Sequence, residues 1–141
     1  MNQVVIANSI SHTAHLGQYR RDGVTPYINH PIAVAAKVRH LGELYEAAAL
    51  LHDVPEDSNI SAADLINAGV DLAVVTAVIT LTKIKGVSYD DYLISVKANP
   101  IARRVKVADM IHNLSESPTD KQIAKYGKGL SFLIDWRLDF L

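Results

Sequence analysis

Apolar residues recur along most of the chain every three to four positions, and short polar segments separate the apolar runs. This spacing is typical of helices that bury one face. Residues 70–81 are rich in Val and Ile, which also suit a strand, but no nearby segment offers a partner strand. The helices that we expect cover residues 2–17, 32–41, 43–51, 61–69, 70–81, 89–98, 101–114, 119–126 and 130–140. The predicted fold class is therefore all-α.

Polar capping residues and prolines predict where several helices begin. The pair Asn99-Pro100 combines a good capping residue with a proline at the first helical position. The pair His30-Pro31 predicts another start and places His30 at a helix N-terminus. Residues 61–64 resemble a capping box, in which two side chains each bond the other's backbone.

One stretch in the first half of the chain joins an apolar helix to a cluster of charge. The apolar run ends at His52-Asp53, and Glu56 and Asp57 follow within four residues. Charge buried at the end of an apolar helix costs free energy unless a partner or a metal offsets it, and carboxylates this close repel one another. A metal site is one hypothesis. The alternative is a helix that Pro55 breaks, with the last two acids as solvated loop charges.

Composition limits the classes of function. The chain has 141 residues, of which 49% are apolar, and a net charge of −1, so we expect one globular domain over residues 1–141. This balance predicts no binding to a nucleic-acid polymer. With no cysteine, any metal must be held by His, Asp or Glu. No apolar run approaches the ~20 residues of a membrane span and no secretion signal is visible, so we expect a cytoplasmic protein without membrane contact. The sequence does not indicate an oligomeric state.

Four candidate metal ligands come from three predicted helices. They are His30, His52, Asp53 and Asp109. Two imidazoles and two carboxylates suit Mn²⁺, Fe²⁺, Co²⁺ or Zn²⁺, with positions left open for water. Simpler interpretations exist for single members: His30 could cap its helix, and Asp109 could pair with an Arg or Lys on its own helix.

A loop is expected over residues 18–29, and it carries two adjacent cations, Arg20 and Arg21. Loops of this kind often carry function. The simpler interpretation is a solvated pair of charges.

Several short motifs follow one another in a characteristic order. The four candidate ligands match the H…HD…D signature of HD-domain phosphohydrolases. The surrounding motifs are Gly17-Gln-Tyr-Arg-Arg, Pro26-Tyr-Ile-Asn-His-Pro, Ala48-Ala-Leu-Leu-His-Asp-Val-Pro-Glu-Asp, Leu81-Thr-Lys and Val105-Lys-Val-Ala-Asp. Over about residues 12–115 this series resembles the hydrolase domain of RelA/SpoT-type alarmone enzymes. The resemblance implies an HD-domain helical bundle, here a stand-alone small alarmone hydrolase of the stringent response.

The resemblance also implies a reaction and a set of roles. The expected enzyme is Mn²⁺-dependent and removes the 3′-pyrophosphate of (p)ppGpp, giving GDP or GTP and pyrophosphate. By position, the metal ligands are His30, His52, Asp53 and Asp109. The pair that activates and positions water is Glu56 and Asp57. The residues that contact the nucleotide are Arg20, Arg21 and Asn113, with Lys83 a weaker candidate.

Two departures from the family pattern leave alternatives open. Family members usually carry Arg two positions after the Asn of the last motif, whereas this chain has Ser115 after Asn113-Leu114. If a phosphate contact is lost, another phosphorylated nucleotide becomes the better substrate, such as NADPH, from which the enzyme would remove the 2′-phosphate. Pro55 stands where an apolar residue is common. A third hypothesis is a nucleotide-binding module without turnover, which the intact Glu56-Asp57 pair argues against.

Overall fold

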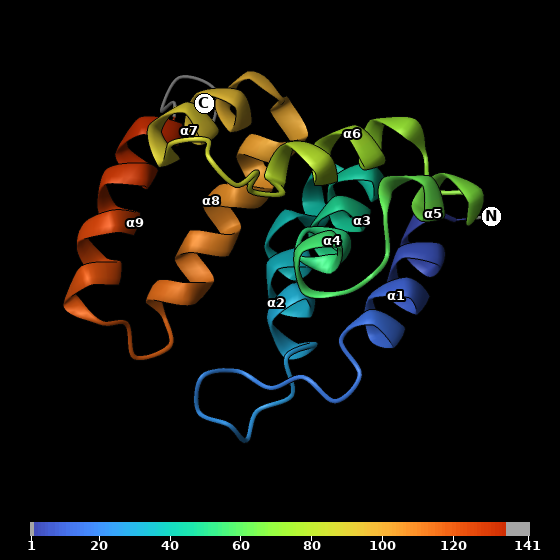
Figure 1. Ribbon diagram of the computed structural model, residues 1–141, viewed down its shortest axis with the longest axis horizontal. Helices are drawn as coiled ribbons and strands as arrows, with labels where there is room; N and C mark the ends of the chain where they lie inside the picture. Colours follow the sequence, from blue (N-terminus) through green and yellow to red (C-terminus); the bar gives the residue numbers. More distant parts are fainter. Residues whose placement is uncertain (1, 135–141) are drawn as a thin grey trace.

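The computed structural model describes residues 2–134, and within them it is a bundle of helices (Figure 1). The elements in chain order are α1 (Gln3–Ala14), α2 (Asn29–Val38), the 3₁₀ turn η1 (Arg39–Leu41), α3 (Glu43–Leu51), α4 (Val54–Asp57), α5 (Ala62–Asn67), α6 (Leu72–Leu81), α7 (Tyr89–Ala98), α8 (Pro100–Leu114) and α9 (Asp120–Leu133). The described residues contain no named strand, only an isolated bridge between Tyr19 and Pro26. The all-α prediction is confirmed.

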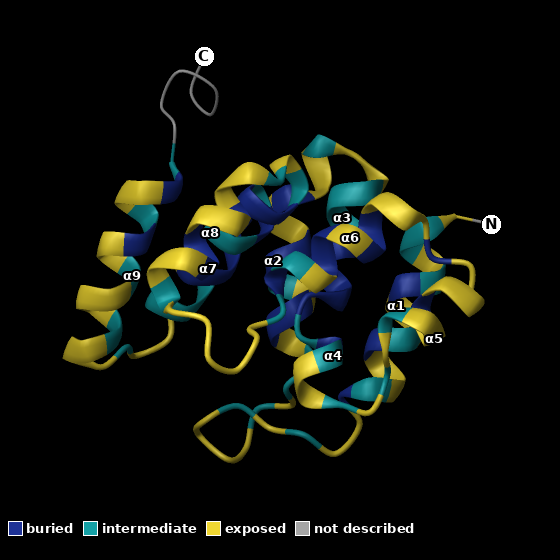
Figure 2. Cartoon of the chain, turned by 45° about the horizontal axis from the view of Figure 1, so that its top comes forward, coloured by how far each residue is buried: buried dark blue, intermediate teal, exposed yellow. Residues whose placement is uncertain are grey.

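The centre of the bundle is α3, which packs against α1, α2, α6 and α8. Its last five residues, 47–51, are all buried, because the Ala/Leu-rich second half of this helix is apolar on every side. The small alanines let the neighbouring helices approach closely. Figure 2 shows the buried residues gathered where these helices meet. Because α3 ends in this core, the residues that follow it begin inside the protein.

The second half of the chain adds α7, α8 and α9, which pack on one another beside the central helices (Figure 1). The buried Arg103 on α8 donates from Nη1 to the carbonyl of Leu133 at a distance of 3.1 Å. This bond satisfies a carbonyl at the C-terminal end of α9, where helix carbonyls lack partners. None of the helices described combines the length and the apolarity needed to cross a membrane.

Most predicted helix boundaries agree with the structure. The helices expected at 43–51 and 89–98 begin and end as predicted. Asn99 caps α8 by accepting a hydrogen bond from the backbone of Ala102, and Pro100 is the first helical residue. The capping box of Ser61 and Asp64 is formed at the start of α5. The β-branched segment 70–81 is helical over α6, which confirms the helical interpretation.

Other boundaries differ by one to three residues, and three of these differences have a local reason. The first helix ends at Ala14, three residues before Gly17, whose φ of +78° belongs to the turn that follows. Pro31 is the third residue of α2 rather than the first, a position where the helix still needs no N–H donor. The α-helix expected to reach Leu41 ends at Val38 and continues as the tighter η1.

One alternative and one larger expectation were wrong. In the alternative interpretation Pro55 led into a loop, whereas in the structure it occupies the first turn of α4 and so begins a new helix after α3. The two helices expected at 119–126 and 130–140 form one helix, α9, which contains both Gly127 and Gly129. The part of the second expected helix beyond residue 134 lies outside the described residues.

Candidate metal centre and the adjoining groove

Three buried side chains from different helices meet at the end of α3. His30 lies in the first turn of α2, His52 directly follows α3, and Asp109 lies on α8. Their ligand atoms all lie within 4.8 Å of one another. The carboxylate oxygen Oδ1 of Asp109 is 2.7 Å from Nε2 of His30 and 3.4 Å from Nε2 of His52. Within the described residues, this group could hold a metal ion.

Asp53 lies beside this group rather than inside it. Its Oδ2 is 3.0 Å from Nε2 of His52 and 3.8 Å from Nε2 of His30. The same oxygen accepts a hydrogen bond of 2.5 Å from the hydroxyl of Tyr27. Asp53 is therefore close to both imidazoles and is positioned by a tyrosine from the loop before α2.

The environment of His52 indicates that the site needs positive charge. Its Nδ1 lies 2.6 Å from the carbonyl of Ala49, so that nitrogen carries a proton and donates it. Its buried Nε2 makes no hydrogen bond of good geometry, although two carboxylates lie near it. Burial lowers the pKa of His52, but Asp53 and Asp109 outweigh this and hold it well above its ordinary value. A divalent cation would supply the same charge, so the donor set fits a metal.

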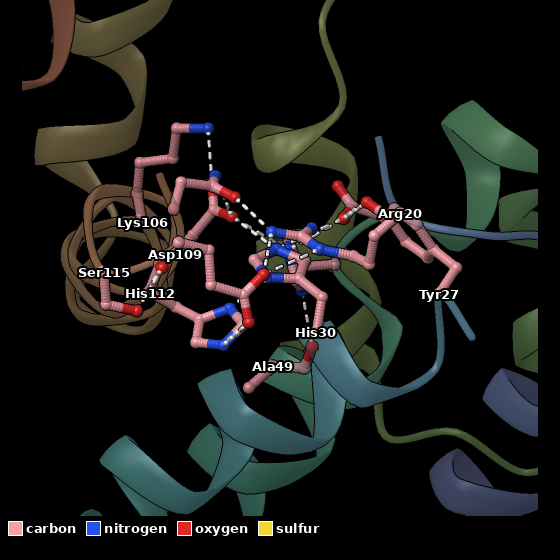
Figure 3. A network of polar contacts seen from close by, with 12 residues as sticks. Arg20, Tyr27, His30, Ala49, Lys106, Asp109, His112 and Ser115 are labelled. Atoms are coloured by element: carbon pink, nitrogen blue, oxygen red, sulfur yellow. Dashed lines mark hydrogen bonds and ion pairs between the residues drawn. The ribbon is translucent and has the colours of Figure 1, made fainter. Parts of the chain in front are cut away.

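Asp109 uses its two oxygens for different partners. Oδ2 forms an ion pair of 2.8 Å with Nζ of Lys106, one turn earlier on α8, whereas Oδ1 faces the two histidines (Figure 3). Burial favours the protonated acid, but Lys106 and the histidines hold the pKa of Asp109 well below its usual range. The ion pair expected from the simpler interpretation is thus present, and it leaves one oxygen turned toward the cluster.

A groove of about 560 Å³ adjoins the cluster, and arginines from the loop before α2 line it together with residues at the end of α8. Asn113 connects the two regions. Its Nδ2 donates to Oδ1 of Asp109 at 3.2 Å, and its Oδ1 accepts from Nη2 of Arg20 at 3.0 Å. The structure thus brings two of the expected nucleotide-binding residues, Arg20 and Asn113, next to the expected metal ligands.

On the other side of the groove, the charged and polar groups bind one another. Glu116 Oε2 forms an ion pair of 3.1 Å with Arg20. Arg21 donates from Nη2 to the carbonyl of Ser117 at 3.2 Å. The hydroxyl of Ser115 donates to the carbonyl of His112 at 2.6 Å and so serves the end of α8. At the position where the resemblance implies an Arg, this chain therefore has a small side chain bonded to its own helix.

The expected catalytic acids, Glu56 and Asp57, lie at the end of the short helix α4, about one turn after Asp53. Both are exposed. Glu56 accepts a hydrogen bond of 2.6 Å from the backbone N–H of Lys83, which fastens its carboxylate to the loop after α6. Partial loss of solvent around its carboxylate and the neighbouring charge of Asp53 raise the pKa of Asp57.

Three polar residues at the site were missing from the sequence prediction. Tyr27 binds Asp53, as described above. His112 stacks on His30 with ring centroids 4.9 Å apart, and the two Nδ1 atoms are 2.7 Å apart. Glu116 lies 3.1 Å from Nε2 of His112 as well as binding Arg20. The available signal was the spacing of three between Asp109 and His112, which places both on one side of a helix.

Comparison with known proteins gives a consistent picture. No family model matches the chain. A guanosine-3′,5′-bis(diphosphate) 3′-pyrophosphohydrolase of Borreliella burgdorferi is 32% identical over 133 residues, which are 82% of this chain and 20% of that protein. The enzyme of the same name in Haemophilus influenzae is 53% identical over 51 residues, 35% of this chain and 7% of its own length. The chain therefore spans a fifth or less of these curated relatives.

A shorter relative and a solved structure are similar to this chain in sequence or in fold. The 3′-pyrophosphohydrolase MESH1 of Danio rerio is 45% identical over 56 residues, which are 36% of this chain and 31% of that protein. A solved structure described as a metazoan ortholog of SpoT that hydrolyses ppGpp has the same fold, with a TM-score of 0.77 at 23% identity over 94% of this chain and 84% of that one. Similar sequence over most of the chain and a shared fold lead to one assignment: the chain belongs to the RelA/SpoT-type family of HD-domain (p)ppGpp hydrolases.

Proposed function

We propose that this chain is a divalent-metal-dependent hydrolase that removes the 3′-pyrophosphate of (p)ppGpp, giving GDP or GTP and pyrophosphate. The observation that carries the proposal is the position of Asn113, whose amide bonds both Asp109 and Arg20. A phosphate held in the groove would therefore lie beside the candidate metal centre. The names of the relatives support the choice of substrate.

The buried group would hold the metal. The proposed ligands are His30, His52, Asp53 and Asp109, with Asp53 as the member that lies beside the other three. Mn²⁺ is our first choice, and Zn²⁺, Fe²⁺ and Co²⁺ suit the same nitrogen and oxygen donors. When bound, such an ion polarises a phosphoryl oxygen and makes water a stronger acid. Tyr27 would orient Asp53 through its hydroxyl.

The groove would bind the phosphates of the nucleotide. Arg20 and Arg21 present planar guanidinium groups, which bind phosphate oxygens in pairs better than an ammonium does. In the proposed reaction, water adds to the phosphorus attached to O3′ and the bond from that phosphorus to O3′ breaks. O3′ ends with a proton, and the arginines offset charge on the departing pyrophosphate.

The acids of α4 would handle the proton that the attacking water loses. Asp57 is the proposed acceptor, because partial loss of solvent and the charge of Asp53 raise its pKa and so bring it closer to the pH of the reaction. Glu56 is fastened to the backbone of Lys83 and would hold α4 in position against the loop after α6.

The small number of uncompensated cations in the groove supports a second candidate substrate. Ser115 supplies no cation, and Glu116 already offsets Arg20. A ligand with a single phosphomonoester needs fewer cations than one with two diphosphates. The alternative function is therefore removal of the 2′-phosphate from a nucleotide such as NADPH.

One substrate comparison tests both functions. Purified protein is stripped of metal, loaded with Mn²⁺ and incubated with ppGpp or with NADPH, and the products are identified by anion-exchange chromatography and mass spectrometry. We expect GDP and pyrophosphate from ppGpp, and little NADH from NADPH. Faster release of phosphate from NADPH would favour the second function. Binding of either nucleotide without products would leave only a binding module.

Two variants separate binding from chemistry. Arg20→Ala should raise KM by roughly 10-fold or more, since it removes a charge-assisted hydrogen bond, and should leave metal content unchanged. Arg39→Ala, on the exposed turn η1, is the matched control and should behave like the wild type. Asp57→Asn should keep metal binding and lower kcat by about 10²–10⁴-fold. An Asp57→Asn variant as fast as the wild type would contradict its role.

A further inference from the structure

We propose that His112 and Glu116 form a relay that fixes the tautomer of His30 and thereby its strength as a metal ligand. The inference rests on the metal centre proposed above. It assigns a positioning role to two residues on α8 that do not themselves belong to the ligand group. The relay begins at the contact between the two Nδ1 atoms of His30 and His112, which are 2.7 Å apart.

A contact of this length between two ring nitrogens requires one proton between them. Either His30 donates from Nδ1 to a bare Nδ1 of His112, or the reverse. In the first arrangement, Nε2 of His30 is bare and offers its lone pair to the cluster. In the second, Nε2 of His30 carries a proton and points it at Oδ1 of Asp109, 2.7 Å away. Only the first arrangement lets His30 bind a metal.

Glu116 favours the first arrangement, whereas Asp109 favours the second as long as no cation lies between its carboxylate and Nε2 of His30. Its Oε1 is 3.1 Å from the other ring nitrogen of His112, Nε2. In the first arrangement this nitrogen carries a proton and faces the carboxylate favourably. In the second it turns a lone pair toward a negative charge, which is repulsive. Glu116 is itself held in place because its Oε2 accepts hydrogen bonds from Nη2 and Nε of Arg20 at 3.1 and 3.2 Å.

The two rings also stack, which holds His112 against His30. The planes of His30 and His112 are inclined by 27° with centroids 4.9 Å apart, and His30 is almost fully buried. In Figure 3, where α8 is seen nearly end-on, Asp109 and His112 are labelled on this helix and His30 on the neighbouring one. Partners that bond the second nitrogen of a ligating histidine commonly change metal affinity by about 10–100-fold when they are removed.

The test measures metal affinity in variants that separate stacking from hydrogen bonding. His112→Phe keeps a flat ring against His30 but offers no acceptor, whereas His112→Gln offers a carbonyl oxygen without the ring. We expect Zn²⁺ dissociation constants, measured by competition with a coloured chelator, to rise about 10–100-fold for His112→Phe. His112→Gln should recover a good part of this loss. The control is His40→Ala, which removes an exposed imidazole outside the candidate metal centre and should leave the Zn²⁺ dissociation constant unchanged.

A spectroscopic readout checks the mechanism directly. In the Zn²⁺-loaded protein, nitrogen-15 spectra of the imidazoles should show the proton of His112 on Nε2 and that of His30 on Nδ1. Glu116→Gln should weaken Zn²⁺ binding by a smaller factor, because its neutral amide no longer selects one tautomer. Circular dichroism verifies that each variant is folded.

The outcomes are distinguishable. Equal affinity of the wild type and His112→Phe, or a proton on Nδ1 of His112, would overturn the relay while leaving the metal centre intact. A wild-type protein that binds no divalent ion would overturn the metal centre and the relay together.

Discussion

Single side chains at the site serve two partners at once. Asp109 divides its oxygens between Lys106 and the histidines, and Asn113 divides its amide between Asp109 and Arg20. The candidate metal ligands could be proposed from the sequence, because a His-Asp pair ends an apolar helix and the set resembles the H…HD…D signature. The partners of His30 could not be predicted. His112 becomes visible only when the first turn of α2 is known to face α8.

The loop that carries the arginines depends on one acid. Asp22 accepts hydrogen bonds from the hydroxyl of Thr25 and from the backbone of Thr25 and Val24, and these lower its pKa from 3.8 to about 2. Because the folded protein favours the ionised form, Asp22 contributes stability above about pH 4. That contribution is lost as the pH falls toward 2.

The prediction is a pH-dependent difference between the wild type and Asp22→Ala. Urea unfolding at several pH values should show the wild type as the more stable protein at pH 7. The difference should stay constant down to about pH 5 and shrink between about pH 4 and pH 2. A difference that is the same at pH 7 and pH 2.5 would show that the ionised carboxylate is not the cause.

At the scale of elements, capping residues determined most boundaries that could be predicted. Asn99 and Ser61 act locally, so their effect needs no knowledge of the rest of the fold. The prediction of two helices where the structure has the single helix α9 failed because distant packing, not a local signal, decides there. Glycine lowers helix propensity by about 1 kcal/mol relative to alanine, which favours a break at Gly127 and Gly129. Packing against α8 outweighs that preference, and no local pattern reports it.

The two glycines of α9 form a matched pair for a stability test. A Cβ at Gly127 would meet no atom within 4 Å, whereas one at Gly129 would lie 2.7 Å from Cε and 3.2 Å from Sδ of the buried Met110. Gly127→Ala should therefore stabilise the protein by about 1 kcal/mol. Gly129→Ala gains the same propensity but overpacks the interface, at a cost of about 1–3 kcal/mol.

The measurement is the free energy of unfolding of both variants in urea. We expect Gly129→Ala to be less stable than Gly127→Ala by about 1–3 kcal/mol. Equal stabilisation by the two substitutions would mean that the side chain of Met110 moves aside freely and that α8 and α9 do not need a glycine at their contact.

At the scale of the whole molecule, the candidate ligands come from α2, the end of α3 and α8, so a bound metal would join three helices. A ligand that binds only the folded state at 100 times its dissociation constant stabilises that state by about 2.7 kcal/mol. For a protein of this size, such a gain raises the melting temperature on the order of 10 °C.

We therefore expect chelation to lower the melting temperature and Mn²⁺ to restore it, as followed by calorimetry. Asp53→Asn should lose most of this shift. Asp90→Asn, which changes an exposed acid on α7, should retain it. A shift of equal size in both variants would place the metal elsewhere on the protein.

The buried ammonium of Lys106 has a consequence for the sequence of events at the site. Asp53 and Asp109 together carry two negative charges, and Lys106 cancels one of them next to Asp109. In the empty cage, the raised pKa of His52 supplies a second positive charge, so the two carboxylates are balanced and the cage has no net charge to attract a polyanion. A divalent ion that displaces the proton of His52 makes the cage positive, and the cage then attracts the nucleotide. The arrival of the metal should therefore precede that of the substrate, and a protein poor in metal should be slow to capture its nucleotide.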